Sequence, residues 1–235
     1  AASDVYKRQI IMAGEIYVFE VIPRASRTVP YISKVTGVPM VDLATRAMLG
    51  EKLREMGYGT DLASISPYVA VKVPVFSSEK LVDVDTHLGP EMKSTGEAIG
   101  YDDKLTRALY KALQATGMNV CNYGTIFVTI ADHDKEQALP LVRRFYDLGF
   151  NVEATTGTAE FLREHGIRTR TRRKLSEGSS EIIDALRQGH VSYVINTIDI
   201  NQHNTRLDGY EIRRTAVENN VTIFTALETV QVLLD

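Results

Sequence analysis

The regular alternation of strand-like and helix-like segments across residues 124–235 constrains the fold of this chain more than any other feature. Short apolar runs, such as residues 124–131 and 190–197, alternate with segments in which apolar residues recur at helical spacing, such as residues 135–147, 159–164 and 210–219. Strands that alternate with helices of this length form a parallel sheet covered by helices on both faces. We therefore predict an α/β domain whose ligands bind at the carboxyl ends of the strands.

A threonine-rich turn, NVEATTGT at residues 151–158, joins one of these strands to the next helical segment. A helix that begins there offers unpaired backbone N–H groups and the positive end of its dipole. The hydroxyl groups of Thr155, Thr156 and Thr158 add donors beside them. The turn is typical of a phosphate-binding cradle, although an ordinary helix N-cap uses the same residues and is commoner when the motif stands alone.

Donor side chains also follow the other predicted strands of this segment. The set contains two lysines, several hydroxyl groups and an amide: Thr129, Lys135, Thr155, Thr158, Lys174, Asn196 and Thr197. We expect these side chains to meet at one edge of the sheet without a cluster of carboxylates, which predicts an anion site. A scatter of unrelated surface residues is the alternative.

Composition excludes several other classes of function. The 235 residues carry a net charge of -3 with a pI near 6.0, which does not favour binding to nucleic acid or an anionic membrane. Cys121 is the single cysteine, so an internal disulfide and a cysteine-based metal site are excluded and a cytoplasmic location is expected. No apolar run approaches the roughly 18 residues of a membrane span.

Two further patterns give only weak evidence of a function. The basic run RTRTRRK at residues 168–174 could suggest nucleic-acid binding, but alternation on a strand makes a solvated face the commoner outcome. Four of the five histidines lie on separate elements and share no ligand spacing, so we do not expect them to form a metal site: His133, His165, His190 and His203.

The first part of the chain contains a short hairpin pattern, with strands expected at residues 10–12 and 16–21. Because a lone hairpin is barely stable in water, we expect the rest of its sheet to lie in sequence absent from this chain. A rigid loop with Arg24 and Arg27 is expected next, close to Glu20 at the end of the second strand. This arrangement would suit a site in which the carboxylate binds Mg²⁺ and the guanidinium groups bind phosphate oxygens. A surface ion pair explains the spacing equally well.

The motifs FEVIPRASRTVPYISKVTGVP (residues 19–39) and LGPEMKSTGE (residues 88–97) resemble the end of the second ATP-grasp unit of the carbamoyl phosphate synthetase large subunit. The resemblance implies that Glu20 binds the Mg²⁺ (or Mn²⁺) of the ATP complex and that Arg24 and Arg27 act in catalysis through phosphate contacts.

The chain departs from this family pattern at two metal-binding positions. Ile22 stands where the family has its metal-binding Asn, and Arg8 lies near the position of a Gln ligand. Neither side chain offers an oxygen atom to a hard cation, so we expect the metal site to be incomplete.

Residues 123–235 resemble the methylglyoxal-synthase-like regulatory domain that ends the same large subunit. The implied fold is α/β: a carboxyl-terminal parallel-sheet, Rossmann-type domain preceded by a partial ATP-grasp α+β segment. The expected organisation has four parts: an unmatched leader at residues 1–9, the partial ATP-grasp segment at 10–115, a linker at 116–123 and the regulatory domain at 124–235.

The resemblance also implies a nucleotide effector, which is UMP as inhibitor or, in some members, IMP or phosphoribosyl pyrophosphate as activator. Its phosphate would be bound by Lys135, Thr155, Thr158 and Lys174, with Thr129 and Asn196 nearby. Members that respond to ornithine have an acidic residue and a tyrosine where Val73 and Ile223 stand here, so we do not expect an ornithine response even though Thr225 matches. Ile198 replaces a hydroxyl that assists nucleotide binding in some members, which leaves the effector open.

The parent enzyme implied by the resemblance makes carbamoyl phosphate from bicarbonate, glutamine-derived ammonia and two ATP, for arginine and pyrimidine biosynthesis. Its implied partners are the remainder of the large subunit and a glutaminase small subunit, and the fragment alone is expected to be inactive. The alternative is a methylglyoxal synthase-type lyase acting on a triose phosphate, which requires a carboxylate base. Ser179 stands where the synthases have their first Asp, and only Asp199 resembles the second, so binding is favoured over lyase chemistry.

Overall fold

The computed structural model describes residues 6–22, 26–58, 66–76, 92–197 and 203–235. The chain divides into two compact units, residues 1–75 with 88–116 and residues 76–87 with 117–235. Each unit is described by itself.

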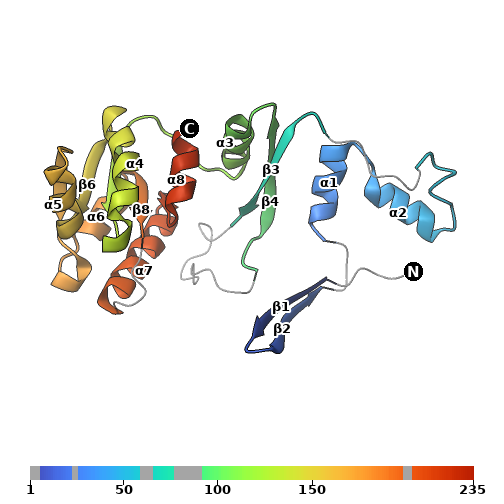
Figure 1. Cartoon of the computed structure of the whole chain (residues 1–235), viewed down its shortest axis with the longest axis horizontal. Coiled ribbons are helices and arrows are strands. Elements are labelled where there is room, and N and C mark those ends of the chain that lie inside the picture. Colours follow the sequence, from blue (N-terminus) through green and yellow to red (C-terminus); the bar gives the residue numbers. More distant parts are fainter. Residues whose placement is uncertain (1–5, 23–25, 59–65, 77–91, 198–202) are drawn as a thin grey trace. The chain divides into compact units, whose positions relative to one another are not determined.

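The carboxyl-terminal unit is built on a five-stranded sheet in which every neighbouring pair of strands is parallel, as predicted (Figure 1). The strands are β5 (Thr125–Thr129), β6 (Asn151–Thr155), β7 (Thr169–Arg172), β8 (Val191–Asn196) and β9 (Thr222–Phe224). Their order in the sheet is β7-β6-β5-β8-β9. The direction of winding reverses between β5 and β8, and ligands of doubly wound sheets bind at this point.

Helices cover both faces of this sheet. One apolar core contains side chains from α4 (Lys135–Asp147), α5 (Thr156–Glu164) and α8 (Leu227–Leu234), and the other from α6 (Glu181–Arg187) and α7 (His203–Glu218). Successive residues of β5 alternate between the two cores, with Ile126 and Val128 in the first and Phe127 in the second. Burial on both faces explains why the strand is a continuous apolar run in the sequence.

Two helices of this unit begin earlier than the sequence predicts. The sequence favours starts near residues 159 and 210, whereas α5 begins at Thr156 and α7 at His203. Threonine has a low propensity for helix interiors but suits the first turn, where N–H groups are unpaired. The early starts bring Thr158 and Asp208 into helices at the edge of the sheet.

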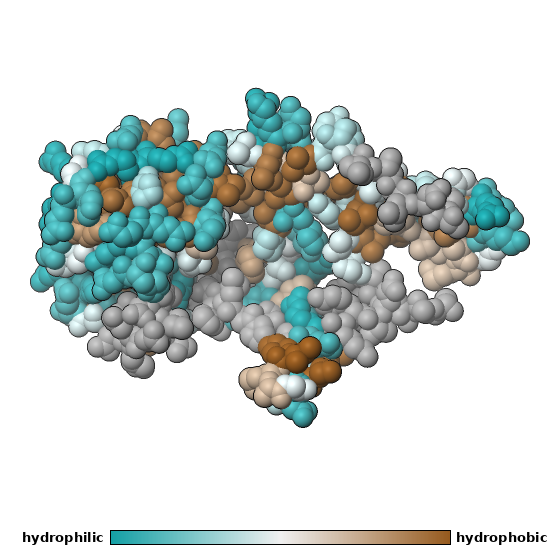
Figure 2. All heavy atoms as spheres, in the orientation of Figure 1, coloured by the Kyte–Doolittle hydropathy of each residue, from teal (hydrophilic) through white to brown (hydrophobic). Residues whose placement is uncertain are grey.

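The amino-terminal unit contains two antiparallel strand pairs. The first is β1 (Tyr6–Met12) with β2 (Glu15–Ile22), joined by Ala13 and Gly14, which both have positive φ as a tight hairpin turn requires. Strand β1 begins before residue 10, so it is longer than predicted. Apolar side chains remain exposed on this hairpin, among them Ile11 and Ile16. Figure 2 shows a brown patch over this part of the chain.

The second pair is β3 (Val69–Val75) with β4 (Gly96–Asp102), and α3 (Leu105–Ala115) packs against it. Gly100 permits this close packing, because a Cβ atom there would lie 2.0 Å from the carbonyl oxygen of Ala108. Asp102 ends β4, and Lys104 is the N-cap residue of α3.

Two short helices, α1 (Thr28–Thr36) and α2 (Met40–Met48), complete the amino-terminal unit. The rigid loop expected around residues 23–30 therefore ends earlier, since Pro30 lies in the first turn of α1, where a missing N–H leaves no bond unmade. Among the described residues, no helix combines the length and the apolar character that crossing a membrane requires.

Candidate functional site

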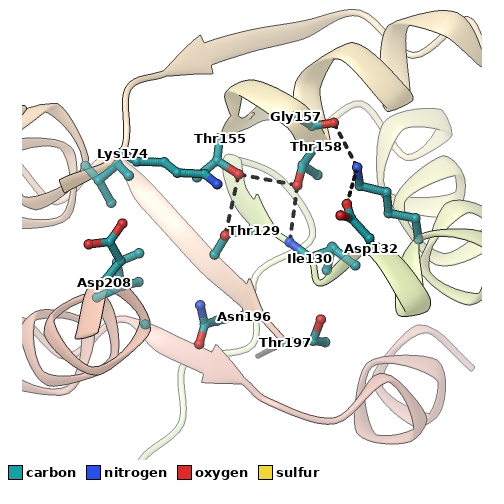
Figure 3. Close-up of a pocket in the computed structure, with 14 residues that line it drawn as sticks. Thr129, Ile130, Asp132, Thr155, Gly157, Thr158, Lys174, Asn196, Thr197 and Asp208 are labelled. Atoms are coloured by element: carbon teal, nitrogen blue, oxygen red, sulfur yellow. Dashed lines mark hydrogen bonds and ion pairs between the residues drawn. The ribbon is translucent and has the colours of Figure 1, made fainter. Parts of the chain in front are cut away.

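The candidate site is a pocket at the carboxyl ends of the strands, where β5 and β8 mark the reversal of winding (Figure 3). The six residues expected around the effector phosphate all line this one pocket: Thr129, Lys135, Thr155, Thr158, Lys174 and Asn196. Thr197, the seventh member of the predicted donor set, lines it as well. Its volume is about 70 Å³, which is room for several water molecules or for a compact oxyanion. We call it the anion pocket.

Three threonine hydroxyl groups meet on one wall of the anion pocket. The Oγ1 atom of Thr155 lies 3.5 Å from that of Thr129 and 3.3 Å from that of Thr158. The backbone N–H of Ile130 donates to Thr158 Oγ1 at 3.3 Å, which links the end of β5 to the first turn of α5. Because a hydroxyl hydrogen can rotate, these groups can turn from one another to donate to a bound oxyanion.

Lys135, the first residue of α4, lines the pocket. Its Nζ atom donates to the Gly157 carbonyl at 3.2 Å and lies 2.7 Å from Asp132 Oδ1. It also stands 5.7 Å from the centroid of the Phe161 ring, within range of a cation–π interaction. The hydrogen bond and charge of Lys135, with a smaller effect of Lys174, lower the pKa of Asp132.

Lys174 approaches the threonines from another strand. It follows β7 at the start of a short 3₁₀ helix, η3 (Leu175–Glu177), and Figure 3 shows its ammonium group directed toward Thr155. Among the described side chains, no carboxylate forms an ion pair with Lys174. Its charge is therefore available to a ligand.

Asn196 ends β8 and supplies the amide. Its Oδ1 atom accepts a hydrogen bond from Arg213 NH1 at 3.1 Å, which leaves the NH₂ group as the donor that faces the pocket (Figure 3). Burial lowers the pKa of Arg213. The neighbouring Thr197 accepts a hydrogen bond from the Ala131 N–H at 2.9 Å and so fixes the chain that leaves β5.

The sequence predicts no cluster of carboxylates at this edge, but two separate carboxylates, those of Asp132 and Asp208, line the pocket. Asp132 pairs with Lys135, and Asp208 Oδ2 accepts hydrogen bonds from the hydroxyl and the N–H of Ser176, at 2.8 and 3.3 Å. Asp132 lies only three positions before Lys135, a spacing that signals an ion pair, whereas Asp208 lies on the part of α7 that the sequence pattern does not predict.

The residues predicted to bind MgATP lie in the amino-terminal unit. Glu20 faces Arg8 across the hairpin, with 3.4 Å between Arg8 NH1 and Glu20 Oε2. Arg27 donates to the Ser94 carbonyl at 3.1 Å, and Arg24 lies outside the described residues.

The described residues here do not fit a magnesium ion. Arg8 brings a positive charge to the Glu20 carboxylate, whereas a hard cation needs several oxygen ligands. Across the parts of the chain that the structure describes, no three His, Cys, Asp or Glu side chains come together as a metal site.

Two family models match separate parts of this chain. Residues 137–225 match a family model described as the MGS-like domain. Residues 9–56 match a second model, described as the carbamoyl-phosphate synthase L chain, ATP binding domain. Among solved structures, the crystal structure of methylglyoxal synthase from Elizabethkingia anophelis NUHP1 is similar at 19% identity with a TM-score of 0.43, covering 49% of this chain and 80% of that chain.

The parallel sheet and the first match define the carboxyl-terminal unit as a methylglyoxal-synthase-like domain. The ATP-binding match precedes it in the chain. Together the two matches, in this order, are those of a carboxyl-terminal portion of a carbamoyl phosphate synthetase large chain, which confirms the resemblance seen in the sequence.

Proposed function

We propose that the anion pocket binds the phosphate group of a nucleotide effector, UMP or a related compound such as IMP or phosphoribosyl pyrophosphate. The observation that carries this proposal is the placement of six donor residues from separate elements around one pocket at the reversal point of the sheet. A pocket with convergent polar groups at this point of an α/β sheet is typical of a ligand site.

The chemistry of the pocket suits a phosphate. Two ammonium groups, from Lys135 and Lys174, would balance the two negative charges of a phosphate monoester through charge-assisted hydrogen bonds. The threonine hydroxyls, the Asn196 amide and the first turn of α5 would supply further donors. Binding would require Lys135 to exchange Asp132 for the ligand.

The effector would regulate a larger enzyme. The ATP-binding match indicates a ligase-family parent, and we assign to that parent the synthesis of carbamoyl phosphate from bicarbonate, glutamine-derived ammonia and two ATP. Occupancy of the pocket would shift the activity of the remaining large subunit and its glutaminase partner through a coupling free energy of about 1–3 kcal/mol. MgATP belongs to that parent, and we assign no metal to the residues described here.

A lyase of the methylglyoxal synthase type is the second candidate, because Asp208 lines the pocket and a carboxylate base is what such chemistry needs. The Asp208 carboxylate is, however, already bound by Ser176, and Ser179 follows Gly178 where the synthases have an acidic residue. Asp199 lies outside the described residues. Nucleotide binding without lyase activity is therefore better supported.

Titration calorimetry with UMP, IMP, phosphoribosyl pyrophosphate and ornithine tests the proposal. We expect at least one nucleotide to bind, no heat from ornithine, and an affinity at least about tenfold lower in Lys174→Ala, which removes a charged donor. Lys34→Ala, an exposed lysine of the other unit, is the matched control. Absence of heat with every nucleotide, or release of inorganic phosphate from a triose phosphate, would overturn it.

A further inference from the structure

A second pocket lies at the opposite edge of the same sheet. Thr125 and Asn151, the first residues of β5 and β6, are part of its wall, whereas the anion pocket lies at the carboxyl ends of these strands. Its volume is about 690 Å³, within the range of small-molecule sites. The charged side chains that line it are Glu153, Arg168, Arg170, Arg172 and His190. We call it the arginine pocket.

The sheet places the three arginines on one face. Successive side chains of a strand point to opposite faces of the sheet. Arg170 and Arg172 of β7, and Arg168 just before it, therefore project to the same face. Thr169, between them, is buried on the other side. Strand β7 is at the edge of the sheet, and Arg170 pairs in register with Glu153 of β6. The alternating arginines, which the sequence pattern places on a solvated strand face, therefore form one wall of a pocket.

A buried carboxylate organises this wall. Glu153 is only 5% exposed and binds Arg172 through two hydrogen bonds, of 2.7 Å from Nε and 2.9 Å from NH2. Arg170 and His190 stand farther away, at 3.7 and 3.8 Å. Because a bidentate pair satisfies both carboxylate oxygens, Glu153 is neutralised by Arg172 and fixes its position.

The remaining charge of the pocket is positive. Three arginines face one carboxylate, so two positive charges stay unbalanced in a chain whose net charge is -3. Arg168 forms no ion pair with any described residue, and the Arg170 side chain is 68% exposed. Guanidinium groups beside a cavity recognise phosphate and carboxylate groups through paired N–H donors.

We propose that the arginine pocket is a second ligand site, which binds a small polyanion with two or more phosphate or carboxylate charges. Arg168 and Arg170 contact the ligand, and the Glu153–Arg172 pair holds the wall in place. The site uses residues that the anion pocket does not use, so it does not depend on the nucleotide site.

Calorimetry on a Lys135→Ala/Lys174→Ala variant isolates the site, because the anion pocket then lacks both ammonium groups. Pyrophosphate and citrate serve as the phosphate and carboxylate ligands, and we expect one of them to bind with one-to-one stoichiometry. Adding Arg168→Ala and Arg170→Ala should weaken that binding by about tenfold or more. Both arginines are exposed, so the variant should fold, and circular dichroism checks this.

The matched control carries Arg107→Ala and Arg187→Ala instead, two exposed arginines outside both pockets, so that the change in net charge is the same. It should bind like its parent. No heat from either anion, or an equal loss in the control, would overturn the proposal. Binding of an acidic peptide with no response to either small anion would also overturn it, by showing a protein-docking surface.

Discussion

At the scale of single residues, Asp132 would compete with the proposed ligand of the anion pocket for the ammonium group of Lys135. Its carboxylate lies 2.7 Å from the ammonium group of Lys135, where a phosphate oxygen would bind. Lys135 lowers the pKa of Asp132, so this carboxylate remains ionised throughout the neutral range. The side chain is largely exposed, and such ion pairs contribute at most about 1 kcal/mol.

We therefore expect Asp132→Asn to bind nucleotide about two- to fivefold more tightly than the unmodified chain, because Lys135 no longer has to leave a charged partner. Calorimetry with the best-binding nucleotide measures this change. Asp147→Asn, at the far end of α4, removes the same charge away from the pocket and should have little effect. Weaker binding in Asp132→Asn would show that the carboxylate helps to hold the ligand.

In contrast to the exposed Asp132, Glu153 is buried, and its ion-pair partner Arg172 is almost buried. The Glu153 and Arg172 side chains are 7% and 12% exposed. Glu153→Ala leaves the guanidinium group without its carboxylate, and we expect the free energy of unfolding to fall by about 3 kcal/mol in urea titrations. Glu160→Ala, an exposed residue of α5, is the comparison and should change stability by less than about 0.5 kcal/mol.

At the scale of elements, the sequence predicts the strands better than the starts of the helices. Buried strands such as β5 and β8 form continuous apolar runs that local pattern identifies directly. The first two turns of α7 are polar, and their helical state depends on the fold around them. For this reason Asp208 is missed as a pocket residue, although Lys135 and Lys174 are found.

The packing of α3 on β4 gives a prediction for the amino-terminal unit. At Gly100 a methyl group would lie 2.0 Å from Ala108 O and 2.4 Å from Ala112 N, both backbone atoms that cannot move aside. We expect Gly100→Ala to destabilise this unit by about 1–3 kcal/mol or more. In Gly96→Ala on the same strand the new atom would meet only Val75 Cβ at 3.7 Å, so this control should unfold at nearly the same urea concentration as the unmodified chain.

At the scale of the whole molecule, the parallel sheet and the convergence of the six donor residues follow from the sequence, because strand ends in such a sheet share one edge. The arginine pocket, in contrast, cannot be predicted from the sequence. The run at residues 168–174 has the alternation of an ordinary exposed strand, and only the register with β6 shows that Glu153 lies among the arginines. A contact between separate strands leaves no local pattern.

The division into two compact units predicts where a bound nucleotide will change protection against hydrogen exchange. A ligand that binds the folded state alone stabilises it by about 2.7 kcal/mol at a hundredfold excess over the dissociation constant. Because the anion pocket is built entirely within residues 117–235, exchange should slow in β5, β6 and β8 and stay unchanged in β3 and β4. Mass spectrometry of exchanged peptides measures the exchange in both groups of strands. Lys174→Ala is the control, in which the nucleotide should no longer slow the exchange. Equal slowing of β3 and β4 would contradict a ligand site confined to the carboxyl-terminal unit.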